Sequence, residues 1–214
     1  VQQQKMFRFE VDQSGRMEEL NRRTVVAAAN EENSFSIVIG GHEKRALYEI
    51  FRMTGAIRYY ATFSFASLVA LAIKGLARQG VKVRELVVDN EYTGYESRIK
   101  RMILSAIPDL EIHFRSIGRK SPAHDAAYYT YIKELKADGA VNRAEILDII
   151  KNAPRGLTPG VDTWIQLPQK GRSITSIASP NDLSRGGAGE WKKVKFLHIG
   201  EEIAAAGGRD RVVW

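Results

Sequence analysis

The sequence predicts an α/β fold built on a mixed β-sheet, and two observations carry that prediction. The first part of the chain holds three short strand patterns joined by polar turns, which is typical of an antiparallel meander. From about residue 42 the apolar residues change to helical spacing, and strands then alternate with helices. Such alternation is typical of parallel strands joined by right-handed crossovers. The expected order of elements is β-β-β-α-(α)-β-α-β-α.

Each strand of the meander has its own signal. The stretch "KMFRFEV" alternates apolar and polar residues, and it ends at "DQSG", where Asp12 and Gly15 offer turn chemistry. The second strand is "TVVAAAN" (24–30), an apolar run. The third is "SFSIVIG" (34–40), which follows the polar turn "NEEN".

The later elements follow from helical spacing, caps and β-branched runs. Ser121 and Pro122 suit the N-cap and first position of a long helix, and Gly139 suits its end. We expect helices at about 42–53, 63–79, 95–107, 121–139 and 143–151, and strands at about 81–89 and 110–118.

The composition changes after Asn152, where prolines and glycines become frequent and no long periodic run occurs. We therefore predict a domain at 1–151 and an irregular C-terminal extension at 152–214. All three tryptophans of the chain lie in this extension, and tryptophan is a common interface anchor. The extension is thus a candidate surface for a protein partner or for self-association.

The totals predict a soluble protein of a reducing compartment such as the cytoplasm. The chain has no cysteine, which excludes disulfides and thiolate metal sites. Its longest apolar stretch, 63–73, is too short to span a bilayer, and the first residues lack the apolar region of a signal peptide, so we expect no membrane association. The net charge of +7 and the pI near 9.6 favour an anionic partner, most commonly nucleic acid, although many soluble proteins are as basic without one.

Three acids occupy places where predicted strands end or the last long helix begins. Asp12 follows the first strand in "FEVDQSG", Asp89 follows the fourth in "LVVDNEY", and Asp125 lies in "KSPAHDAAYYTY". Over roughly residues 5–138, the element order and these acids resemble the ribonuclease H-like superfamily. The "DQSG" stretch resembles the "DESG" start of some poorly characterised bacterial and archaeal members, with Gln13 in place of the family's glutamate.

The resemblance implies a five-stranded sheet in the order 3-2-1-4-5, with helices on both faces and an acidic cluster at the strand ends. It implies a metal-dependent nuclease, or a related phosphoryl-transfer enzyme, in which Asp12, Asp89 and Asp125 bind Mg²⁺ or Mn²⁺. Glu49, in the first helix, is the candidate fourth acid. His124 is a candidate proton shuttle or substrate contact.

The chemistry of such a cluster can be argued without the family. Neighbouring parallel strands end at one edge of a sheet, about 4.8 Å apart, and carboxylates there repel unless a cation lies between them. Two hard cations about 4 Å apart can stabilise both the attacking water and the leaving oxygen of a phosphodiester. Each acid also has an ordinary reading, as a turn residue, a loop residue or a helix cap. Glu91 and Glu96 are read as solvent-facing acids.

Several basic and aromatic residues are candidate contacts to nucleic acid. Arg119, Lys120 and Ser121 come just before a helix N-terminus, where backbone N–H groups favour phosphate, although an ordinary capped helix has the same pattern. The other basic candidates are Arg22, Arg23, Lys44, Arg45, Arg98, Lys100 and Arg101, of which Arg98 and Arg101 share a helix face. The tyrosines that can either stack bases or fill the helix–sheet interface are Tyr128, Tyr129 and Tyr131.

A second function class stays open at this point. The chain can instead be a non-catalytic ribonuclease H-like module that binds nucleic acid or assembles a larger complex. Gln13 and the long Pro/Gly-rich extension favour this alternative.

Overall fold

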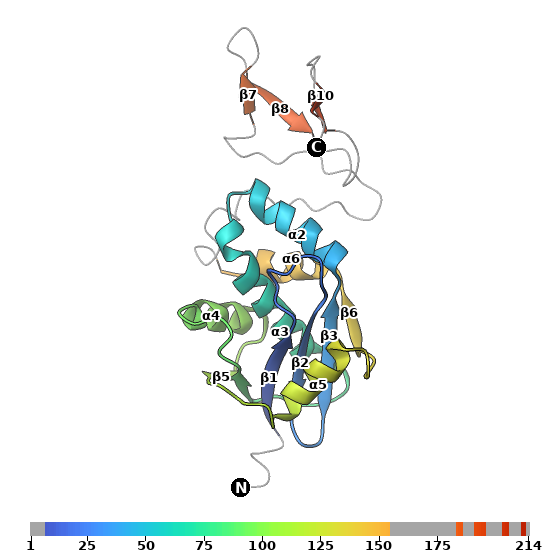
Figure 1. Ribbon diagram of the computed structural model, residues 1–214. Helices are drawn as coiled ribbons and strands as arrows, with labels where there is room; N and C mark the ends of the chain where they lie inside the picture. Colours follow the sequence, from blue (N-terminus) through green and yellow to red (C-terminus); the bar gives the residue numbers. More distant parts are fainter. Residues whose placement is uncertain (1–6, 155–182, 186–190, 196–202, 206–210, 213–214) are drawn as a thin grey trace.

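The computed structural model describes residues 7–154 and, beyond them, only the backbone of four short strands. It shows an α/β fold with one six-stranded mixed sheet (Figure 1). The strands are β1 (Arg8–Ser14), β2 (Thr24–Ala29), β3 (Ser34–Ile39), β4 (Glu85–Val88), β5 (Glu111–Phe114) and β6 (Gly139–Val141). The helices are α2 (Gly41–Met53), the 3₁₀ turn η1 (Ile57–Tyr59), α3 (Tyr60–Arg78), α4 (Glu96–Ala106), α5 (Pro122–Tyr131) and α6 (Arg143–Lys151).

The sheet has the order β5-β4-β1-β2-β3-β6. β1, β2 and β3 form the expected antiparallel meander, β4 and β5 run parallel to β1, and β6 runs parallel to β3. The predicted five-stranded order 3-2-1-4-5 is therefore incomplete, because a sixth strand is added outside β3. The ends of β1, β3, β4, β5 and β6 all lie at one edge of the sheet, which we call the C-terminal edge.

The prediction of one helix over 121–139 is wrong in its second half. α5 ends at Tyr131, and Lys133 has a left-handed backbone with φ of 71°. The chain then turns toward β3, where the Asp138 carboxylate accepts hydrogen bonds from the backbone N–H and the hydroxyl of Ser36, at 2.7 and 3.1 Å. These bonds fasten the start of β6 beside β3.

The first turn also differs from the prediction. β1 continues to Ser14, so Asp12 and Gln13 are paired strand residues opposite β2 rather than turn residues. The turn begins at Gly15, whose φ is 77°. Glycine suits this position because an added Cβ would come 2.5 Å from the Arg23 carbonyl and from the Tyr131 ring.

Helices cover both faces of the sheet, and the alternation of β1 decides what each face receives. Phe9 and Val11 enter the large apolar core that α3 completes, while Asp12 points to the opposite face, where it meets His124 of α5. Figure 1 shows α5 lying across this face of the sheet. α5 packs on that face with Ala127 against Val25 and its neighbours on β2. Because α5 offers small residues there, it lies close enough to the sheet to meet the acid.

The long apolar helix belongs to the core of the protein. Within the described residues, Ile57–Arg78 is long and apolar enough to cross a membrane by length and composition, but 78% of its apolar window is buried inside the protein. The helix is longer than the apolar stretch 63–73 that was expected to be too short for a bilayer, so it is burial rather than length that assigns it to the core.

The extension is described only in part. Four short strands pair antiparallel in the order β10-β9-β8-β7, namely β7 (Leu183–Arg185), β8 (Trp191–Lys195), β9 (Ile203–Ala205) and β10 (Arg211–Val212). Trp164 and Trp214 lie outside the described residues, as does most of the range 152–214 for which an interface was predicted.

Candidate metal centre

The pairing of β1 with β4 brings two of the predicted acids together. The backbone N–H of Asp89 donates to the Val11 carbonyl at 3.0 Å, so the β1–β4 ladder extends one residue past the end of β4. Asp89 therefore lies beside Asp12, the next residue of β1. The neighbourhood predicted from the element order is present in the structure.

A third carboxylate joins them from the loop after β4. Asp12, Asp89 and Glu91 each offer an oxygen, and these oxygens all lie within 4.8 Å of one another. The Glu91 N–H donates to the Asp89 carbonyl at 2.9 Å, a tight turn that brings the Glu91 side chain back to the strand end. We call these three residues the acidic trio. Such a set of oxygens can hold a metal ion.

Asp12 is the buried member of the trio, with 4% of its surface exposed. Its Oδ1 accepts from the Gln13 N–H at 2.8 Å, and its Oδ2 lies 2.8 Å from Nδ1 of His124. Burial raises the pKa of Asp12 above its usual value, and the charge of Asp89 acts in the same direction, while the bonds from Gln13 and His124 oppose it. A nearby cation would relieve both unfavourable causes.

Glu91 has a raised pKa as well. Desolvation of its carboxylate is the largest cause, followed by the negative charges of Asp89 and Asp12. The residue as a whole is exposed, so its side chain has room to adjust. Two acids with raised pKa values therefore lie at one strand end, where a bound cation would favour their ionised forms.

α5 places His124 against the trio. The Ser121 hydroxyl accepts from the Ala123 N–H at 3.1 Å, which confirms the predicted N-cap, and Pro122 follows in the first turn. One turn into the helix, the His124 ring reaches Asp12 and stacks on Tyr128, with ring centroids 6.1 Å apart. An ionised Asp12 fixes Nδ1 of His124 as the donor, which leaves Nε2 as the free nitrogen of the ring.

Two of the predicted acids do not join the trio. Asp125 is exposed in the first turn of α5, because the residue after His124 is turned about 100° around the helix axis, away from the strand ends. Glu49 is exposed on α2 and forms an ion pair with Arg52 at 2.7 Å. Glu91, which the sequence places in an ordinary polar loop, is the third acid of the trio instead. In the sequence, only its spacing of two residues from Asp89 indicated that the two acids could lie together.

Of the three predicted phosphate contacts near α5, two are exposed and one is buried. Arg119 and Lys120 are exposed in the loop after β5. That loop is held to the trio, since Oδ1 of Asp89 accepts from the Ile117 N–H at 3.0 Å. Ser121 is buried and serves as the cap of α5.

Three of the other basic candidates make contacts within the protein, and a fourth is exposed. Arg98 lies over the Tyr59 ring, 4.6 Å from its centroid, and Lys100 donates to the Ile112 carbonyl at 3.0 Å. Arg101 is exposed on α4. Arg45 donates to the Asn21 side chain at 3.2 Å.

Lys44 is not a phosphate contact, because it is fully buried on α2. Its ammonium group lies 2.7 to 3.0 Å from four acceptors in the loop between β1 and β2. Burial lowers the pKa of Lys44 to about 8, while Glu19 and Glu18 act in the opposite direction. The four acceptors are the carbonyls of Arg16, Glu19 and Arg22 and the hydroxyl of Thr24.

The geometry stands alone as evidence of function. Comparison of the chain with protein-family models, with curated proteins and with solved structures gives no match.

Proposed function

We propose that the protein is a divalent-metal-dependent nuclease, or a related phosphoryl-transfer enzyme, of the ribonuclease H-like kind. The acidic trio at the strand ends is the observation that supports this proposal most. Asp12, Asp89 and Glu91 would hold the metal, in place of the predicted set that contained Asp125. Nucleic acid would be the substrate, in keeping with the net charge of +7.

The trio suits Mg²⁺ or Mn²⁺. All its donors are carboxylate oxygens, which hard cations prefer. The oxygens of the trio lie within 4.8 Å of one another, and the exposed Glu91 side chain has room to move toward a shared ion.

Each neighbouring residue has a role that its contacts support. A divalent cation, when bound, supplies positive charge against the phosphodiester. Asp12 holds His124 by Nδ1, so Nε2 is available to take a proton from water or to return one to the leaving oxygen. Asp89 holds the loop that carries Arg119 and Lys120 through the Ile117 N–H, and these two exposed cations would bind a phosphate of the substrate.

A cleavage assay on single-stranded, duplex and hybrid substrates with Mn²⁺ tests the proposal. Wild-type protein should cleave at least one of them, and Asp89→Asn should lose the activity. Asp109→Asn is the matched control, because Asp109 is an exposed acid before β5, at the opposite edge of the sheet from the trio. Its φ of 65° is tolerated by asparagine, so the control should fold and keep wild-type activity. Equal activity in wild type and Asp89→Asn would refute the proposal.

A non-catalytic module is the second candidate. The exposed positions of Asp125 and Glu49 favour it, because two acids implied by the resemblance take no part in the trio. It predicts that the wild-type protein binds oligonucleotides and cleaves none of them in Mg²⁺ or Mn²⁺. The same assay therefore separates the two candidates.

The cytoplasm is the compartment we propose for either function. The absence of cysteine suits a reducing environment, and the one apolar helix long enough for a membrane is mostly buried in the core within the described residues.

A further inference from the structure

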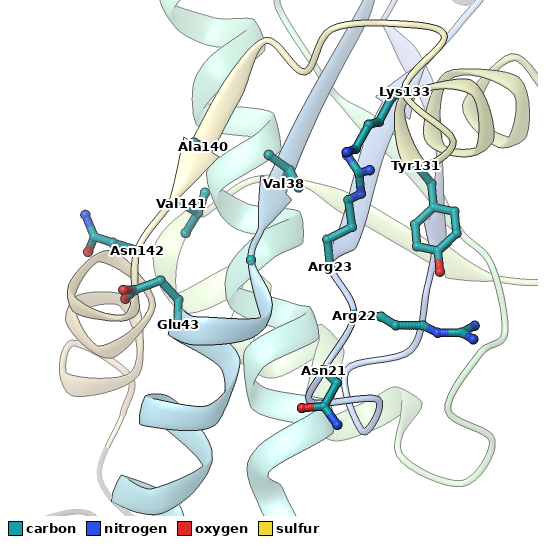
Figure 2. A pocket seen from close by; sticks show the side chains of 11 residues that line it. Asn21, Arg22, Arg23, Val38, Glu43, Tyr131, Lys133, Ala140, Val141 and Asn142 are labelled. Carbon is teal, nitrogen blue, oxygen red and sulfur yellow. The ribbon is translucent and has the colours of Figure 1, made fainter. Parts of the chain in front are cut away.

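An open groove lies at the C-terminal edge of the sheet, on the side of β3 and β6 and away from β4. It measures about 1020 Å³, and Figure 2 shows the side chains that line it. The loop before β2 supplies one wall and the end of α5 another, while β3, the start of α2 and β6 supply the rest. The groove does not include the acidic trio.

Three cations face this groove, and one acid does. Arg22, Arg23 and Lys133 line it together with Glu43. The Glu43 carboxylate is already bound, at 3.1 Å, to the guanidinium group of Arg143. In the part of the chain described as 7–154, no carboxylate lies within 4 Å of the three cations. The groove therefore carries uncompensated positive charge.

Two of the three cations approach each other. In Figure 2 the side chains of Arg23 and Lys133 point toward each other, whereas the side chain of Arg22 extends away from them, below Tyr131. Like charges that converge repel each other, and an anion between them removes that cost. Tyr131 also lines the groove, and its aromatic ring is a surface on which a base can stack.

The strand register gives an estimate of the distance between the groove and the trio. Asp12 on β1 pairs with Ala27 on β2, and Arg23 lies four residues before Ala27, just ahead of the first residue of β2. Four strand residues span about 14 Å. If the bound strand keeps the spacing of one strand of duplex DNA, about 3.4 Å per nucleotide, that distance corresponds to about four nucleotides.

We propose that this groove binds the phosphate backbone of a single nucleic-acid strand, about four nucleotides from the acidic trio. Arg23 and Lys133 clasp one or two phosphates, and Arg22 extends the contact outward. The site rests on the proposed function for its substrate class, but binding in it requires neither metal nor cleavage. It gives the enzyme a minimum substrate length.

Binding of fluorescent oligonucleotides in EDTA, where a metal-dependent nuclease is silent, tests the groove separately from catalysis. The double variant Arg23→Gln/Lys133→Gln should bind a strand of about 12 nucleotides at least tenfold more weakly. Its slope of log K against log salt should be shallower by about 1.4, the value for two lost phosphate contacts on a single strand. A strand of about three nucleotides is long enough to occupy the groove by itself, so the variant should bind it more weakly than wild type as well.

The matched control removes the same charge elsewhere. In the control variant Arg78→Gln/Lys82→Gln, the two changed residues lie at the opposite edge of the sheet, between the end of α3 and the start of β4. This variant should bind both oligonucleotides as wild type does. The melting temperature of each variant shows whether it is folded. If the change at the partly buried Arg23 prevents folding, the variant Arg22→Gln/Lys133→Gln repeats the test. Unchanged affinity in a folded groove variant, or equal weakening in the control, would overturn the proposal. Loss of cleavage alone would bear only on the trio.

Discussion

Asp12 and Lys44 are both charged groups that the fold removes from water, and their surroundings satisfy them in different ways. Lys44 meets four oxygen acceptors, so its charge is bound within the protein. Asp12 has the Gln13 N–H and His124 on one side and two further carboxylates on the other. The charge of the lysine is thus balanced by contacts within the protein, whereas the aspartate lies in a set of carboxylates that could hold a cation.

At the metal centre, Glu91→Gln and Asp125→Asn separate the observed trio from the set expected from the sequence. Glu91→Gln removes one of three ligands and should weaken Mn²⁺ binding at least tenfold. Asp125→Asn changes an exposed helix residue outside the trio and should leave the affinity within about twofold of wild type. Titration calorimetry with Mn²⁺ measures both. The reverse ranking would restore Asp125 as the third ligand.

Lys44→Met should lower the free energy of unfolding and change its pH dependence. Methionine fills similar space but leaves buried acceptors without a donor, at a cost of about 1–3 kcal/mol. In wild type the folded-state pKa of about 8 lies below the unfolded value of 10.5. Below pH 8 both states are protonated, and above it the unfolded chain holds a proton that the folded protein has released. Wild-type stability should therefore rise between pH 8 and 10, by up to about 1.4 kcal/mol per pH unit.

Urea denaturation at several pH values checks this slope. Lys44→Met should show less rise than wild type over the same window. The comparison stops at pH 10, because the raised pKa values of Tyr60 and Tyr92 make stability fall at higher pH. A slope that is identical in both proteins would contradict the assignment to Lys44.

At the scale of elements, α3 and β3 approach each other unusually closely. A Cβ added at Gly75 of α3 would come 2.2 Å from the ring of Phe35 on β3, so the ring would have to move. Glycine in a helix normally costs about 1 kcal/mol relative to alanine. Its presence here is explained by this contact.

Gly75→Ala should therefore destabilise the protein by roughly 1–3 kcal/mol, although helix propensity alone would stabilise it. The second change Phe35→Leu should restore part of the loss, because a smaller side chain admits the new methyl group. Chemical denaturation of the single and double variants measures this coupling. A Gly75→Ala protein that is more stable than wild type would refute the close approach.

The same scale shows what sequence reasoning could reach. The meander, the alternation after it and the N-cap at Ser121 were predictable, because each has a local signal several residues long. β6 was not, since three residues give no periodicity and its position depends on a distant bond between Asp138 and Ser36. Asp12 and Asp89 were found from element order. Glu91 was missed because a tight turn, not a strand or helix, directs it, and Asp125 was misjudged because one residue changes the face of a helix.

At the scale of the whole molecule, a bound cation should raise the melting temperature. Mn²⁺ or Mg²⁺ at millimolar concentration binds the folded trio and not the unfolded chain, so thermal unfolding shifts upward at pH 7.5. The raised pKa values of Asp12 and Glu91 mean that protons displace the metal at a higher pH than for ordinary carboxylates. The shift should therefore shrink as the pH falls toward 5.

The protein without metal should show the opposite trend. A carboxyl group whose folded pKa is raised binds more protons in the folded state, so protonating it favours folding as the pH falls through that range. Differential scanning fluorimetry with metal and with EDTA separates the two curves. Asp12→Asn should remove the dependence on metal, and a metal shift that persists in that variant would place the ion elsewhere.

The ammonium group of Lys44 also restricts insertions and deletions in the segment between β1 and β2. Surface loops usually accept insertions and deletions. Here the carbonyls of residues 16, 19 and 22, three residues apart, must all reach one nitrogen, so adding or removing a single residue between them would put at least one out of reach. The contacts to Lys44 thus fix the number of residues between β1 and β2. We expect insertions and deletions to be tolerated far better in the loop between β2 and β3.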